Sequence, residues 1–229
     1  MTPDPMIGSP PGTSVLPLPA RRLARRVSVA LCLVAGGAAV LAPPVAAHGA
    51  DVPPEPAPAD LLFGWSFDPS IQLPLLATLA VWLIAVRRVD RAHPGSPVPR
   101  RRTVAFVAGL AAIEIALQSG IERYDTTLFT IHMVQHILLI MVAGPLIALS
   151  APITLALRVA RPDIRRRWIV PLLHSRIVRA IGHPVVAWLV FAGVLWGTHF
   201  SPIFDHSLED PVVHDLEHVA FVAASLLFW

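Results

Sequence analysis

Two pairs of histidines in this chain are each separated by one turn of a helix. The first pair, His132 and His136, lies in the segment HMVQH, and the second, His214 and His218, lies in VHDLEH. Residues four apart in a helix project from the same face, so each pair can direct both imidazoles toward one object. Neutral imidazole nitrogens bind copper or zinc at about 2.0–2.1 Å. The spacing therefore predicts a metal site shared between two helices, without deciding between the two metals.

Two other chemistries remain open for the same residues. The segment HDLEH fits the H-x-x-E-H pattern of zinc peptidases, in which Glu217 would be the general base. The 11 residues after His218 contain no acidic third ligand, however, and HMVQH lacks the glutamate of H-E-x-x-H. Histidines in membrane helices also bind haem iron, which makes a haem or quinone redox protein the other alternative.

The composition indicates an integral membrane protein. Hydrophobic residues make up 55% of the 229 residues, and charged residues only 14%. The basic residues, all arginine, occur in short blocks without interleaved aromatic residues, so we expect membrane lipids as partners and no nucleic acid. The single cysteine, Cys32, excludes a disulfide framework and makes a thiolate metal site improbable. These features predict an all-α transmembrane helix bundle.

Four segments divide the chain. Residues 1–20 are rich in proline, glycine, serine and threonine and are expected to be disordered. Residues 21–47 begin with RRLARR and continue as an apolar run, which is typical of a signal peptide cleaved after Ala47 or of a first span. Cleavage there would leave His48 as the first residue, whose amino group and imidazole could chelate copper together. An acidic, proline-rich external linker is expected at 48–70, followed by a transmembrane helical domain at 71–229.

Apolar runs separated by charged blocks predict the spans of this domain. A helix needs roughly 20 residues, at 1.5 Å per residue, to cross about 30 Å of hydrocarbon. We expect spans at Ile71–Val86, Thr103–Ile121, Thr127–Leu149 and from Pro184 to His199 or Phe200. The third span is expected to tolerate Pro145 as a kink and to end before Pro152.

The last apolar run is expected to begin near Glu217, after an external loop with the sequence SPIFDHSLEDPVVHD. It has 13 residues up to Trp229, fewer than a crossing requires. The sequence therefore predicts that the natural chain continues beyond Trp229. We expect about five spans here, counting the N-terminal segment, out of about seven.

The distribution of arginine predicts the orientation of the bundle. Seventeen of the 18 arginines lie at the N-terminal block, in the loop at 87–102 and in the segment 158–179, which are therefore expected to be cytoplasmic. The opposite ends of the spans then carry six of the ten histidines on the extracytoplasmic side. We take five of these as candidate metal ligands: His132, His136, His199, His214 and His218. His206, in the expected loop, is a weaker candidate.

The sequence also predicts roles for several other polar residues. Asp215 and Glu217 are candidates for accepting hydrogen bonds from the metal-binding imidazoles. Glu114 lies midway along its span, where it would act as a proton or cation relay or would bond Gln118 one turn away. The remaining histidines on the arginine side are expected to be solvated: His93, His174 and His183.

From about Ile71 to Trp229 the chain resembles the multi-span bacterial CtaG family, which assists assembly of caa-type cytochrome c oxidases. The resemblance depends on the histidine pair before GPLIALSAP, on the W…H ending of the next span and on VHDLEH before LFW. It is not the single-span assembly family of the same name, whose cysteine copper motif this chain lacks.

This resemblance implies a multi-pass protein of the bacterial plasma membrane that helps mature cytochrome c oxidase. It implies copper handling on the outer face, with oxidase subunits as partners and His132, His136, His199, His214 and His218 as the ligands. Our leading hypothesis from the sequence is therefore a metallochaperone without enzymatic activity, which holds copper loosely and passes it on by ligand exchange.

Overall fold

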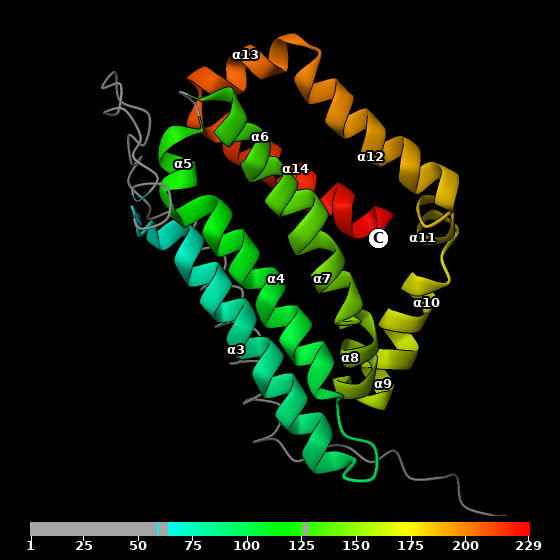
Figure 1. Ribbon diagram of the computed structural model, residues 1–229. Coiled ribbons are helices and arrows are strands. Elements are labelled where there is room, and N and C mark those ends of the chain that lie inside the picture. Colours follow the sequence, from blue (N-terminus) through cyan, green and yellow to red (C-terminus); the bar gives the residue numbers. More distant parts are fainter. Residues whose placement is uncertain (1–58, 60–63, 126–127) are drawn as a thin grey trace, which may run out of the picture. The chain divides into compact units, whose positions relative to one another are not determined.

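The computed structural model describes residues 59, 64–125 and 128–229, and their regular secondary structure is entirely helical (Figure 1). The helices are α3 (Pro69–Ala92), α4 (Arg100–Gln118), α5 (Gly120–Tyr124), α6 (Phe129–Ile137), η1 (Leu138–Ala143), α7 (Gly144–Leu149), α8 (Pro152–Val159), α9 (Pro162–Ile164), η2 (Arg165–Ile169), α10 (Val170–Leu173), α11 (Arg176–Ile181), α12 (Pro184–His199), α13 (Pro202–Glu209) and α14 (Pro211–Phe228). The predictions for residues 1–20 and 21–47, for most of the linker at 48–70, and for Cys32 and His48 fall outside these described residues.

Four helical stretches in the described residues are long and apolar enough to cross a membrane: 69–92, 100–124, 129–159 and 211–228. Helix α12 has 16 residues and passes this test only together with α13, from which it is bent by 67°. Counting that bent pair as one span gives up to five. The prediction of a multi-pass helical membrane protein is therefore confirmed.

Four helices begin in the same way, with a capping side chain followed directly by proline. The caps are Asp68 for α3, His183 for α12, Ser201 for α13 and Asp210 for α14. Each cap accepts a hydrogen bond from the backbone N–H two residues later. Proline at the first helical position costs no hydrogen bond, because a backbone N–H there would have no partner within the helix. The start predicted at Pro184 is confirmed.

The same arrangement overturns the loop expected between Ser201 and Asp215. These residues form α13 and the first turn of α14, so the last helix begins at Pro211 and not near Glu217. It has 18 residues where 13 were expected. The polar residues at its start misled the apolarity argument, because His214, Glu217 and His218 lie on the buried face of the helix.

The two π-helical segments each end two residues before a proline. Segment η1 precedes Pro145 and η2 precedes Pro171. In η1 the backbone shifts to a wider repeat, and the N–H of Gly144 bonds the carbonyl of Leu139. The carbonyl of Ile140 would then require the N–H of residue 145, which proline does not have.

Ser225 of α14 supplies the missing partner. Its hydroxyl donates to the carbonyl oxygen of Ile140 at 2.6 Å, and Ser225 is fully buried. Gly144 makes this approach possible, because a Cβ at that position would overlap the Ser225 side chain. The contact fixes α14 against η1 and α7 two turns below His218.

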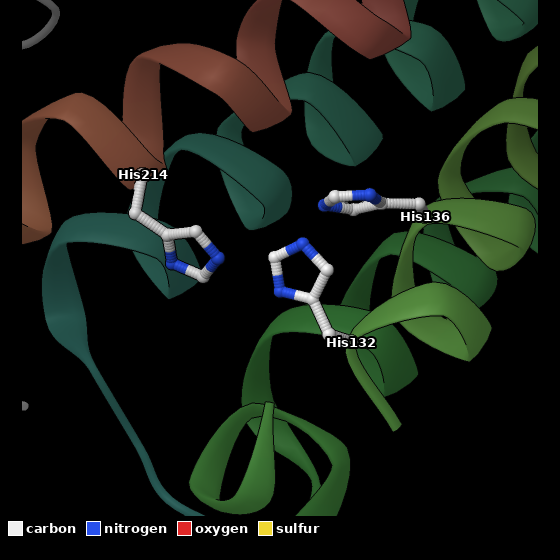
Figure 2. A group of neighbouring side chains, drawn as sticks. All are labelled: His132, His136 and His214. Carbon is white, nitrogen blue, oxygen red and sulfur yellow. The ribbon is translucent and has the colours of Figure 1, made fainter. Parts of the chain in front are cut away.

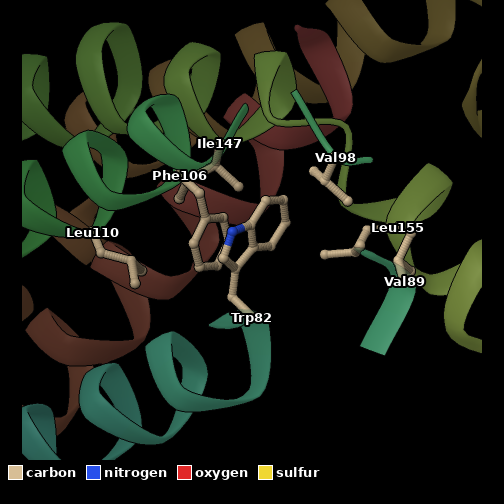
Figure 3. Close-up of a cluster of buried hydrophobic side chains, with 7 residues drawn as sticks. All are labelled: Trp82, Val89, Val98, Phe106, Leu110, Ile147 and Leu155. Carbon is tan, nitrogen blue, oxygen red and sulfur yellow. The ribbon is translucent and has the colours of Figure 1, made fainter. Parts of the chain in front are cut away.

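A hydrophobic core lies between α3, α4, α7 and α8 (Figure 3). Its centre is the stacked pair Trp82 and Phe106, with ring centroids 3.9 Å apart and planes 10° apart. Val89 and Leu155 join α3 to α8 beside them. Most of α3 is otherwise exposed to the surroundings, as expected of a helix at the lipid-facing edge of a bundle.

The helix ends fall into two groups. The turn between α3 and α4 lies with α8 at one end, where Arg158 donates a hydrogen bond to the carbonyl of Ser96. At the opposite end α4 runs into α5, α6 begins, and α13 joins the end of α12 to the start of α14 (Figure 1). All five histidines proposed as ligands belong to helix ends of this second group.

Replacing Gln118 with leucine should destabilise the protein. Gln118 is fully buried and binds the backbone of Asp68 twice, with Oε1 accepting from its N–H at 2.9 Å and Nε2 donating to its carbonyl at 3.1 Å. Leucine would leave both backbone groups unpaired beside the start of α3. We expect a loss of about 1–3 kcal/mol in unfolding free energy. Thermal unfolding in detergent would measure it, and an unchanged midpoint would contradict the role given to this contact.

Candidate metal centre

Three buried histidines from two helices converge at the second group of helix ends. His132 and His136 project from α6 toward His214 of α14 (Figure 2). One ring nitrogen of each lies within 4.8 Å of those of the other two. We call these three residues the histidine trio. The trio contains both histidines of HMVQH but only His214 of the pair in VHDLEH.

The rings around the trio are tightly packed. The ring centroids of His132 and His136 are 4.2 Å apart, and those of His132 and His214 are 5.7 Å apart. The rings of His214 and His218 are also 4.2 Å apart, while His199 approaches His136 at 5.2 Å. All five candidates therefore occupy one cluster, but His199 and His218 lie at its edge.

The polar atoms of the trio are buried, and several of them have no hydrogen-bond partner among the described residues. Each trio residue is at most 1% exposed. Within the described part of the chain, three ring nitrogens have no hydrogen-bond partner: both nitrogens of His132 and Nε2 of His136. A buried polar group without a partner costs about 1–3 kcal/mol, and such groups in a folded protein often mark a ligand site.

His199 reaches the cluster from the last turn of α12. Its Nδ1 lies 2.9 Å from the carbonyl oxygen of Leu195 and its Nε2 lies 3.3 Å from Nδ1 of His136. Thr198 contributes a contact of 3.1 Å to the same Nδ1 and donates its own hydroxyl proton to the carbonyl of Val194. Unlike the trio, His199 is only partly buried.

His218 is held by a residue that the sequence analysis did not select. Gln135, fully buried between the two histidines of HMVQH, places Oε1 3.1 Å from Nε2 of His218. Its amide nitrogen donates to the carbonyl of Ala116 at 3.0 Å and to Oε2 of Glu122 at 2.6 Å. This fixes the amide orientation, so Nε2 of His218 carries the proton and donates to Gln135. A polar side chain inside an otherwise apolar run was the signal that could have revealed it.

Carboxylates also surround the trio, though not the pair expected. Asp125, 1% exposed, lies 3.5 Å from Nε2 of His214, and an oxygen of Glu122 is close enough to form a second donor group with them. Asp215 is exposed. Glu217 is buried, but within the described residues its carboxylate accepts no hydrogen bond, so the expectation that it orients an imidazole is wrong.

Aromatic rings close the cluster on its other sides. The ring of Phe221 packs 4.5 Å from that of His136, and Phe204 of α13 packs 5.7 Å from that of His132. These rings occupy the space beside the trio. The arrangement suits a single ion much better than a macrocycle such as haem, which needs a wide flat slot between its axial ligands.

The remaining polar candidates lie away from the cluster. His206 is exposed on α13, and the three histidines of the arginine side are exposed as expected: His93, His174 and His183. Glu114 does not bond Gln118. It faces Gln72 of α3 instead, whose amide nitrogen, in the orientation that satisfies both groups, donates to Oε1 at 2.6 Å.

The spacing of the trio is compatible with a shared ion. Bonds of about 2.0–2.1 Å place the nitrogens around one ion roughly 3.3–3.6 Å apart, and the trio nitrogens all lie within 4.8 Å of one another. Three nitrogens without a thiolate form a borderline donor set, which is compatible with copper and with zinc. In the peptidase alternative, His214 and His218 would bind the same metal ion. The structure favours a different set of ligands, because Nε2 of His218 faces Gln135 and the two other histidines of the trio belong to α6.

A family model for cytochrome c oxidase caa3 assembly factors matches residues 80–229, which include the whole cluster. The chain belongs to this family. It is also similar to uncharacterized proteins of Mycobacterium bovis and Mycobacterium tuberculosis, each 32% identical over 190 residues and 79% of this chain. A relative in Mycobacterium leprae is 29% identical over 187 residues. No solved structure matches.

The match to the caa3 assembly factor family covers α4 to α14 and the C-terminal half of α3, so it includes α6, α12 and α14, which carry the buried histidine cluster. The mycobacterial relatives are much longer, since the matched region is only 28% of their length. Their names assign no activity.

Proposed function

We propose that this caa3 assembly factor family member binds copper through His132, His136 and His214 and delivers it to a subunit of cytochrome c oxidase. The observation that carries the proposal is the convergence of three buried imidazoles whose nitrogens include three atoms, on His132 and His136, without a hydrogen-bond partner in the described residues. Copper is favoured over zinc because the resemblance to the CtaG family implies copper handling. The ion is cargo: the protein would form and release coordination bonds to it but would catalyse no reaction.

The donor set suits temporary binding. Imidazoles can be exchanged one at a time for ligands of a recipient protein, and the absence of a thiolate keeps the affinity moderate. His218 lies next to His214 with ring centroids 4.2 Å apart, so it offers a neighbouring nitrogen during exchange. The buried carboxylate of Asp125 supplies negative charge near the bound cation.

We place the cluster on the extracytoplasmic side of the bacterial plasma membrane. Support comes from the arginines at 87–102 and 158–179, which lie at the opposite helix ends from the cluster. Arginine-rich loops remain in the cytoplasm. Copper held there would reach a recipient on the outer face without crossing the membrane.

Metal analysis of the full chain, purified in detergent and dialysed against excess copper at a buffered free concentration, tests the proposal. We expect about one copper per wild-type chain and at least a 100-fold weaker affinity when all three trio residues are replaced by alanine. The matched control replaces the exposed His93, His174 and His183 with alanine and should bind as the wild type does. Equal copper binding by the trio variant and the wild type would refute the proposal.

A further inference from the structure

His136 cannot direct both of its nitrogens to the same ion. The two nitrogens of an imidazole point to different sides of the ring, so each can serve only its own neighbour. Nδ1 of His136 faces Nε2 of His199 at 3.3 Å, whereas Nε2 of His136 is buried without a partner in the described residues, so we assign Nε2 to the trio. An ion held by the trio at Nε2 therefore leaves Nδ1 of His136 and His199 outside its coordination shell.

The contact between His136 and His199 needs one proton. Two unprotonated nitrogens at 3.3 Å would repel each other, and two protonated ones could not bond. Nδ1 of His199 lies 2.9 Å from the carbonyl oxygen of Leu195, which only accepts, so this nitrogen carries the proton of a neutral His199. Its Nε2 must then accept, and Nδ1 of His136 must donate. The consequence is that Nε2 of His136 bears a lone pair.

We propose that His199 is a positioning residue and not a metal ligand: it holds His136 in the tautomer whose Nε2 lone pair faces His132 and His214. This deepens the proposed function and depends on it for the identity of the ion. It differs from the sequence interpretation, which placed His199 among the ligands. Metal-binding histidines commonly donate their other N–H to a fixed acceptor, and here a second imidazole, itself anchored to a backbone carbonyl, is that acceptor.

The alternative is an ion bound between His136 Nδ1 and His199 Nε2. A separation of 3.3 Å would fit two ligands of one tetrahedral ion. That pair, however, gains no third histidine, cysteine or carboxylate donor among the described residues, whereas the trio is complete. His199 is also less buried than the trio residues. The number of donors and their burial therefore favour the trio.

Two variants of His199 separate a positioning role from a coordinating one. In His199→Gln the amide oxygen can still accept from Nδ1 of His136, while in His199→Leu no acceptor remains. We expect copper affinity within about threefold of the wild type for the glutamine variant and 10–100-fold weaker for the leucine variant. Loss of affinity in both variants to the same extent would overturn the proposal.

Spectroscopy supplies a readout that a merely structural defect would not mimic. Pulsed electron paramagnetic resonance of protein loaded with Cu(II) counts coordinated imidazoles through their remote nitrogens. The count should be the same for the wild type and His199→Gln, and one imidazole fewer in the variant would identify His199 as a ligand and refute the inference.

The metal-free protein provides an independent check. Nitrogen-15 histidine spectra should show Nδ1 of His136 protonated in the wild type and in His199→Gln, with this preference lost in His199→Leu. A His136 ring protonated at Nε2 in the wild type would refute the inference even if copper binds. Normal tautomers in a wild-type protein that takes up no copper would instead refute the proposed function alone.

Discussion

Replacing His132 with leucine is expected to abolish stabilisation by copper while leaving the metal-free protein at least as stable as the wild type. Both ring nitrogens of His132 are buried without a partner in the described residues, so the side chain contributes packing but no hydrogen bond. Leucine keeps much of that packing and removes a desolvated polar group that costs about 1–3 kcal/mol. If His132 served only the fold, its replacement would lower the stability of the metal-free protein and leave the effect of copper unchanged.

Thermal unfolding in detergent, with and without copper, would measure both effects. At a free copper concentration 100 times the dissociation constant, the wild type should gain about 2.7 kcal/mol of unfolding free energy. The leucine variant should gain almost none. His206→Leu, an exposed histidine of α13, is the control and should respond to copper like the wild type. A copper-induced shift of wild-type size in His132→Leu would show that the site lies elsewhere.

Replacing Gly144 with alanine should destabilise the bundle and weaken the metal site together. A Cβ at Gly144 would overlap the side chain of Ser225 and force α14 away from α7. The hydroxyl of Ser225 would then lose the carbonyl of Ile140, which has no backbone donor because residue 145 is proline. Overpacking and the unpaired carbonyl together should cost about 2–5 kcal/mol.

Gly193 provides a matched control on α12. A Cβ there meets no atom within 4 Å, so alanine should be neutral or stabilise its helix by up to about 1 kcal/mol. Unfolding midpoints and copper affinities of the two alanine variants, measured in the same detergent, give the comparison. Because His214 lies on α14 above Ser225, we expect weaker copper binding only in the Gly144 variant. Equal behaviour of the two variants would contradict this account of the helix crossing.

The sequence alone was sufficient for the helical class and for most span positions. These features follow from local patterns: apolar runs that match the hydrocarbon thickness, arginine blocks between them, and proline at the first position of α12. Membership in the caa3 assembly factor family was also recognisable from the two histidine pairs and their neighbouring segments, and the family model confirms it. The start of the last helix was misjudged, because apolarity averaged along the chain does not register a polar helix face that is buried.

The composition of the centre depended on the tertiary structure. Spacing showed that His132 and His136 share a face, and likewise His214 and His218, but not that His214 would join the first pair while His218 turned to Gln135. That division follows from the rotation of α14 about its axis, which the contact of Ser225 with η1 sets. Such a rotation comes from packing between helices distant in the sequence, and no local pattern encodes it.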